Sequence, residues 1–209
     1  IYEGTYKYED FNKSGNTYTL KSNVPHYASE ANTQPGMPKY RDLNGDGVID
    51  SNDRTVIGNG IPKHTGGFTN NFNYRDFDLS IFFQWSYGND VLNANRLMFE
   101  SSCNRTRELN QYASYAERWT ESNPTSNIPR ATSSSSNRVF SSRIIEDGSF
   151  LRLKTVTLGY TVPRKMISRV GIEQLRVYFA AQNLFTISNY SGYDPEVSIR
   201  DSALTPGLD

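Results

Sequence analysis

One segment, Phe77–Tyr87, restricts the fold of this chain more than any other. Its odd positions all carry apolar or aromatic side chains, whereas its even positions are polar except for Phe82. Because successive side chains of a β-strand point to opposite faces, this alternation predicts a strand with one apolar and one polar face. Such a strand is roughly 33 Å long and, tilted by about 40°, rises about 25 Å, the height of the apolar band of an outer-membrane β-barrel.

The preceding segment supports this interpretation. A two-residue turn at Arg75-Asp76 would pair Tyr74 with Phe77 and place apolar side chains opposite each other along both strands, except at Asn70. The expected same-face pairs are Phe72 with Leu79, Asn70 with Ile81, and Phe68 with Phe83. Polar residues of the first strand then share the face of the polar residues of the second. This single turn therefore places the apolar residues of both strands on one face and the polar residues of both strands on the other.

A second hairpin repeats the pattern. Its expected apolar face consists of Val156, Leu158, Tyr160 and Val162, opposite Leu175, Val177, Phe179 and Ala181. Arg152 and Lys154 continue the apolar parity of the first of these strands. Because a cation at the bilayer midplane costs roughly 2–4 kcal/mol, we expect both to lie where the strand leaves the hydrocarbon.

The rest of the chain is typical of an all-β protein, because turn residues separate runs rich in Tyr, Phe, Val, Ile and Thr. The expected strands are Gly4–Tyr8, Tyr18–Lys21, Thr65–Tyr74, Phe77–Tyr87, Ile144–Val162 and Leu175–Ile187. Apolar residues at helical spacing predict one short loop helix in Arg107–Trp119, and Pro163 predicts a single helical turn at Arg164–Val170.

The connections between strands are asymmetric in length. Arg75-Asp76 and Pro163–Gln174 are short, whereas Gly88–Arg143 and the first sixty or so residues are long. Outer-membrane barrels have short periplasmic turns and long outer loops, so the asymmetry favours an antiparallel transmembrane β-barrel segment with long extracellular loops. A soluble β-sandwich also has one apolar and one polar face, and it stays open as the alternative.

The composition excludes several functional classes. The 22 basic and 22 acidic residues give a formal net charge of zero, which argues against a nucleic-acid partner. The single cysteine, Cys103, excludes a disulfide framework and a multi-thiolate metal site, and we expect it to be an unreactive loop thiol. No long apolar run is present that would form a transmembrane helix.

The segment Asp42–Asp53 has the ligand spacing of a calcium loop of the EF-hand type. Oxygen-bearing side chains stand at loop positions one, three, five and twelve, and Val48 offers its carbonyl at position seven. The expected ligands of a structural Ca²⁺ ion are Asp42, Asn44, Asp46, Val48 and Asp53. The alternative is a metal-free loop in which Asp and Asn side chains bind their own backbone.

No arrangement of residues indicates an enzyme. A phosphate-binding glycine loop, a nucleophile elbow and a His-rich metal motif are all absent from the sequence. Tyr112, Tyr115 and Trp119 are candidates for stacking on a substrate or on a partner surface. Their alternative role is to pack the loop helix onto its own domain.

Several sequence blocks together resemble the C-terminal part of SusC/RagA-type TonB-dependent outer-membrane receptors. The blocks run in the order of that family and cover most of the chain. They are Tyr40–Asp50 with Asp53–Gly58, Phe77–Gln84 with Tyr87–Asn89, Ser149–Lys154 with Thr157–Tyr160, Gln182–Thr186, and Gly192–Glu196.

The resemblance implies a 22-stranded barrel in the cell outer membrane, an N-terminal plug, and a lid lipoprotein of the SusD type. It implies TonB-dependent import of oligosaccharides or other oligomeric nutrients, including peptides. Contact with the TonB complex would require an N-terminal region that this chain does not contain.

We therefore expect residues 1–209 to form one partial domain, the C-terminal part of a receptor barrel that lacks the plug and the last strand. The beginning at Ile1 and the turn residues near Asp209 also suggest an internal piece of a longer protein. A secreted, calcium-stabilised β-sandwich that binds carbohydrate is the alternative function.

Overall fold

The computed structural model describes residues 1–27, 29–101, 110–132 and 139–196. The chain divides into two compact units. We call residues 1–58 and 92–145 the loop unit, and the described part of residues 59–91 and 146–207 the sheet unit. Cys103 and the first part of the expected helix Arg107–Trp119 lie outside the described residues.

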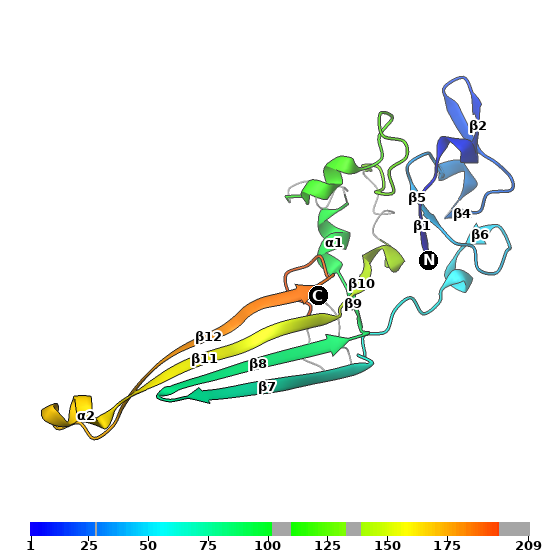
Figure 1. The fold of residues 1–209 in the computed structure, drawn as a ribbon. Helices are drawn as coiled ribbons and strands as arrows, with labels where there is room; N and C mark the ends of the chain where they lie inside the picture. Colours follow the sequence, from blue (N-terminus) through cyan, green and yellow to red (C-terminus); the bar gives the residue numbers. More distant parts are fainter. Residues whose placement is uncertain (28, 102–109, 133–138, 197–209) are drawn as a thin grey trace. The chain divides into compact units, whose positions relative to one another are not determined.

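Strands are the main regular elements of the described residues, and the helices are few and short (Figure 1). The strands are β1 (Tyr2–Thr5), β2 (Phe11–Ser14), β3 (Thr17–Leu20), β4 (His26–Tyr27), β5 (Pro38–Tyr40), β6 (Val48–Ile49), β7 (His64–Tyr74), β8 (Phe77–Tyr87), β9 (Asp90–Leu92), β10 (Ile145–Asp147), β11 (Phe150–Val162) and β12 (Leu175–Ser188). The α-helices are α1 (Ala94–Phe99) and α2 (Arg164–Ile167), and the 3₁₀ helices are η1 (Tyr8–Asp10), η2 (Glu30–Asn32), η3 (Ser51–Asp53), η4 (Ala113–Glu117), η6 (Ser142–Ile144) and η7 (Ser168–Val170). None of the helices in the described ranges is long and apolar enough to cross a membrane.

The sheet unit is an antiparallel sheet in the order β12-β11-β8-β7. Figure 1 shows these four long strands side by side, with the α2 turn joining β11 to β12 at one end. No sheet closes on itself within the described part of the chain, so the number of strands in a complete barrel stays a prediction.

The predicted hairpin registers are confirmed. Tyr74 pairs with Phe77, and every further expected pair of this hairpin is present. The turn is possible because Arg75 adopts a positive φ of 55°. In the second hairpin, Val156 pairs with Ala181 and Val162 with Leu175, as the alternation predicted.

A β-bulge in β11 places Arg152 on the opposite face of the strand from the one predicted. The register of β11 shifts between Leu153 and Thr155, so β11 carries one more residue there than β8. Because an extra residue exchanges the two faces of a strand, Arg152 lies opposite Gln84, on the polar face. Arg152 therefore avoids the apolar face altogether, and the prediction that it marks the edge of that face is wrong.

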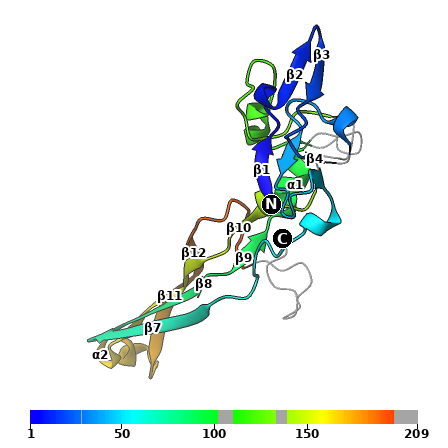
Figure 2. The same ribbon diagram turned by 90° about the vertical axis from the view of Figure 1, so that its right-hand side faces the viewer.

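The loop unit has its own small core. Tyr6, Phe11 and Leu20 are buried, and Tyr18, Val24 and Met37 pack against them. The hairpin β2–β3, visible in Figure 2, and the pair β1–β5 surround this core.

Besides shifts of one residue and short strands that were not predicted, three elements differ from the predictions. Tyr8 begins a 3₁₀ turn in place of ending a strand, because the Asp10 carboxylate accepts a hydrogen bond from the Lys7 N–H at 2.9 Å. The expected strand Ile144–Val162 is interrupted at Gly148, whose N–H bonds the Asn89 carbonyl at 2.8 Å.

The third difference is the loop helix. In the described part of Arg107–Trp119 only the 3₁₀ helix η4 forms. An α-helix that was not predicted, α1, lies nearby in sequence, and the Asn93 side chain caps it by accepting the Arg96 N–H at 2.8 Å.

Candidate functional site

The sheet unit carries large apolar side chains on one face. Phe72, Phe77 and Phe179 are each half exposed or more, and Leu158 and Val177 share this face. Soluble proteins rarely leave such a continuous apolar surface in water. Within the sheet unit no second sheet covers it, as a β-sandwich would require. The arrangement fits a wall with one face against lipid.

The opposite face of the sheet carries polar side chains joined by ion pairs. Asp78 on β8 binds Arg176 on β12 through both carboxylate oxygens, one of them at 3.1 Å from Nε. The pair passes over Gly159 on β11, where a Cβ atom would collide with both partners. The absence of a side chain at Gly159 therefore lets two strands that are not neighbours share an ion pair.

A second ionic cluster holds the segment after β12 against the polar face. Arg152 is buried, and its guanidinium binds Asp194 and, at 2.8 Å, Glu196. Glu196 also accepts hydrogen bonds from Gln84 at 3.1 Å and Lys154 at 3.2 Å. Burial raises the pKa of the Asp194 carboxyl, but the hydrogen bonds from Arg152 and from the Glu196 backbone, with the charges of Arg152 and Lys154, together outweigh burial and hold the pKa below its usual value. The Asp-Pro-Glu segment is therefore an anchor for the loop that follows β12.

The predicted calcium loop is folded around Asp53. This buried carboxylate accepts hydrogen bonds from the backbone N–H groups of Leu43 at 2.7 Å and Asp50 at 2.8 Å. These backbone hydrogen bonds hold the pKa of Asp53 below its usual value. Asp53 closes the loop by joining both ends of the segment.

The other acidic residues of the loop also accept backbone N–H groups. Asp42 accepts from Gly45 at 2.6 Å and Gly47 at 2.8 Å, and Asp46 accepts from Val48 at 2.8 Å. Hard oxygen donors of this kind suit Ca²⁺. In the described ranges, however, no three acidic, His or Cys side chains gather closely enough to hold an ion. The set Asp42, Asn44, Asp46, Val48 and Asp53 stays a prediction, and the geometry shown is that of Asx-type turns.

The three aromatic residues proposed for substrate contact have different surroundings. Tyr115 and Trp119 are buried in the loop unit, which matches the packing alternative. Tyr112 is half-buried, with its ring centroid 5.4 Å from that of Phe99. Contact of these residues with a substrate stays a prediction.

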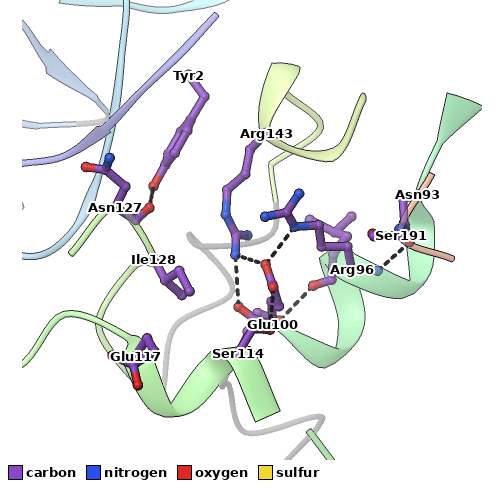
Figure 3. Close-up of polar contacts among 12 residues, drawn as sticks. Tyr2, Asn93, Arg96, Glu100, Ser114, Glu117, Asn127, Ile128, Arg143 and Ser191 are labelled. Atoms are coloured by element: carbon purple, nitrogen blue, oxygen red, sulfur yellow. Dashed lines mark hydrogen bonds and ion pairs between the residues drawn. The ribbon is translucent and has the colours of Figure 1, made fainter. Parts of the chain in front are cut away.

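The sequence analysis missed a buried ionic cluster around Glu100 (Figure 3). The Glu100 carboxylate accepts hydrogen bonds from Arg96 at 2.8 Å, Arg143 at 2.7 Å and Ser114 at 2.6 Å. Burial raises the pKa of Glu100, but the hydrogen bonds from Arg96 and Ser114 and the charges of both arginines outweigh burial and hold the pKa below its usual value. The cluster joins three separate segments of the loop unit. Only the spacing of Arg96 and Glu100, four residues apart, was visible in the sequence.

Sequence comparison with curated proteins shows the family of this chain. No protein-family model matches the chain. TonB-dependent receptor P26 of Formosa agariphila is 39% identical over 164 residues, covering 78% of this chain and 16% of the relative. TonB-dependent receptor SusC of Bacteroides thetaiotaomicron is 30% identical over 170 residues, covering 80% of this chain and 16% of the relative.

A solved structure shares the fold. The RagAB peptide importer in its closed-closed state matches with a TM-score of 0.68 and 23% identity, over 100% of this chain and 20% of that chain. The chain is a segment of a SusC/RagA-type TonB-dependent receptor. This receptor segment spans only 16% of the length of each of the two curated relatives described above. The resemblance seen in the sequence blocks is therefore confirmed, and the relatives are receptors rather than enzymes.

Proposed function

We propose that this receptor segment forms part of the wall and the outer loops of an outer-membrane importer of oligomeric nutrients. The observation that carries the proposal is the four-stranded sheet with one exposed apolar face and one face of ion pairs. Such a wall separates acyl chains from an aqueous lumen. In this proposal the side chains that share the face of Phe77 contact lipid, and those that share the face of Asp78 line the lumen.

The long connections lie outside the cell in this proposal. Gly88–Arg143 and Ser188–Asp209 then meet the substrate or a lid lipoprotein of the SusD type. The TonB complex supplies energy through a region that this segment does not contain. Oligosaccharides and peptides are both compatible with the family, because SusC and a RagAB peptide importer are among the similar proteins.

An uptake experiment tests the proposal. A strain that lacks the receptor is complemented with the wild-type gene, and uptake of fluorescently labelled oligosaccharides and oligopeptides is compared with uptake of a monosaccharide. We expect oligomer uptake to need both the receptor and an intact TonB system, and the receptor to fractionate with the outer membrane. A protein that is soluble and monomeric without detergent would instead support the carbohydrate-binding β-sandwich.

A structural Ca²⁺ ion in the loop Asp42–Asp53 belongs to this proposal as a stabilising element. The loop precedes β7, one of the two edge strands of the sheet in the described residues. Its oxygen-rich composition supports a role for the ion in holding the loop rigid. The ion takes no part in transport.

A further inference from the structure

The loop unit contains a cavity that, apart from Trp119, is separate from the features described above. Its volume is about 590 Å³, within the usual range for a small-molecule site. The walls come from the β2–β3 hairpin, from the segment around Gln34, and from the stretch that includes Trp119. We call this cavity the aromatic groove.

Three aromatic rings follow one another along the aromatic groove. The ring centroids of Tyr18 and Tyr8 are 5.2 Å apart, and those of Tyr8 and Trp119 are 5.6 Å apart. Trp119 is buried, whereas both tyrosines are half-buried. The backbone at Gly36 has a positive φ of 81° and packs so closely on the indole that a Cβ atom would collide with it. The chain therefore holds Trp119 rigidly as the base of the row.

Two phenol hydroxyls of the aromatic groove are available to a ligand. Neither phenol hydroxyl, of Tyr8 or Tyr18, makes a hydrogen bond to a residue that the structure describes. A phenol hydroxyl both donates and accepts, so each can bind a ligand hydroxyl. The side chains of Asn16 and Gln34 add amide groups to the same lining.

The aromatic groove has a positive balance of charge. Among the described residues, Arg118 and Arg130 line it together with one acidic residue, Glu121. The Arg130 guanidinium lies 5.6 Å from the Trp119 ring centroid, and that of Arg118 lies 5.2 Å from the centroid of Tyr115. Within the described ranges Arg118 forms no ion pair, and its hydrogen bond goes to the Tyr115 backbone carbonyl at 3.4 Å. A guanidinium that has no ion-pair partner can bind the carboxylate of a ligand through charge-assisted hydrogen bonds.

The lining distinguishes between classes of ligand. Among the described residues, no Leu, Ile, Val, Met or Phe lines the aromatic groove, so this part of the chain offers no large aliphatic pocket for peptide side chains. Flat aromatic surfaces next to hydroxyl, amide and guanidinium groups suit a ring that carries C–H faces, hydroxyls and a negative charge. We propose that the aromatic groove binds an acidic oligosaccharide, with a uronic acid ring against Tyr8 and Tyr18 and its carboxylate at Arg118. This inference rests on the proposed import function and names its substrate class.

Calorimetric titration of the detergent-solubilised receptor tests the inference. The probes are trigalacturonate, trimannuronate, the neutral methyl ester of each, and a tetra-aspartate peptide. We expect at least one uronate to bind at least tenfold more tightly than its ester and than the peptide. The inference is overturned if neither uronate binds, if the ester of each bound uronate binds as tightly, or if the peptide binds best.

Variants locate the site. Arg118→Gln is expected to weaken uronate binding at least tenfold and to leave binding of the neutral ester unchanged, with Arg118→Lys restoring part of the affinity. Tyr18→Ala is expected to weaken binding of the uronate and of the neutral ester alike. Arg164→Gln, an exposed arginine in α2, is the matched control. Equal affinities in wild type and Arg118→Gln would refute the assignment.

A parallel uptake assay separates this inference from the proposed function. If the receptor imports oligomers in a TonB-dependent way but Arg118→Gln binds and imports uronates normally, the aromatic groove is not the site and the import function stands. If uronates bind to the wild type and Arg118→Gln weakens this binding as expected, but no import occurs, the proposed import function is refuted and the binding site is supported. Hydrogen exchange of β2 and β3 confirms that each variant is folded.

Discussion

Asp78 and Arg176 form a bidentate ion pair that crosses the intervening strand β11 above Gly159. The pair links β8 to β12, which are not neighbours in the sheet. A glycine in the interior of a strand usually weakens it, unless another group needs the space. Here two side chains occupy the space above Gly159, so the glycine and the ion pair depend on each other.

Gly159→Val should therefore disrupt the polar face of the sheet. The new side chain would collide with the ends of both the Asp78 and the Arg176 side chains, so the ion pair that links β8 to β12 must be displaced. We expect backbone hydrogen exchange in β11 to become at least about fivefold faster. Thr157→Val, on the same face of the same strand, is the control. Adding Arg176→Ala should relieve part of the effect, and a double variant as unstable as Gly159→Val alone would contradict the explanation.

The two faces of β8 should respond differently to a charge. Ile81→Lys places a cation on the apolar face in the middle of the strand, where it costs roughly 2–4 kcal/mol in a bilayer. We expect a strong loss of folded receptor from the outer-membrane fraction, measured by the heat-dependent shift in gel mobility. Ser80→Lys, one residue away on the opposite face, should assemble normally. Equal amounts of folded receptor in both variants would contradict the assignment of the faces.

The sheet was predictable from the sequence because strand alternation is local. A single turn at Arg75-Asp76 fixed the register of the first hairpin, and the alternation of β11 and β12 fixed the second. The bulge between Leu153 and Thr155 was missed, although the apolar parity changes there from Leu151 and Leu153 to Val156 and Leu158. Arg152 was for this reason assigned to the wrong face.

The loop unit was much harder to predict. Its residues make contacts with residues far away in the sequence, such as that of Arg143 with Glu100. The spacing of apolar residues along the chain does not indicate such contacts. Trp119 was identified as a candidate from its residue type alone. The neighbouring Tyr8 and Tyr18, which complete the aromatic groove, lie more than a hundred residues away and left no signal.

The Glu100 cluster should make the loop unit sensitive to acid. The pKa of Glu100 is lower in the folded chain than its ordinary value of 4.5. Its stabilising contribution is therefore complete above about pH 4.5 and is lost as the pH falls through the lower pKa of the folded state. We expect hydrogen exchange of α1, corrected for intrinsic rates, to accelerate below pH 4.5.

Glu100→Gln supplies the control for this pH dependence. The substitution leaves the buried Arg143 without its counter-charge, and breaking a buried ion pair typically costs about 3–5 kcal/mol. We expect α1 to lose protection at neutral pH and to show no further acid-dependent loss. An unchanged acid response in Glu100→Gln would assign the titration to another group.

Calcium should stabilise the loop Asp42–Asp53 if its oxygen atoms bind the ion. In the receptor stripped with a chelator, we expect millimolar Ca²⁺ to release or absorb heat in a saturable titration and to slow hydrogen exchange of this loop. Asp46→Asn keeps the side-chain shape and an oxygen that can accept the Val48 N–H, but it removes one charge from the ligand set. The variant should therefore keep the protection of the metal-free loop and lose most of the response to Ca²⁺.

Asp53→Asn should lower protection even without the ion, because the Asp53 carboxylate joins Leu43 to Asp50. A wild-type receptor that neither binds Ca²⁺ nor changes its exchange would leave the Asx-turn network as the whole explanation of the loop.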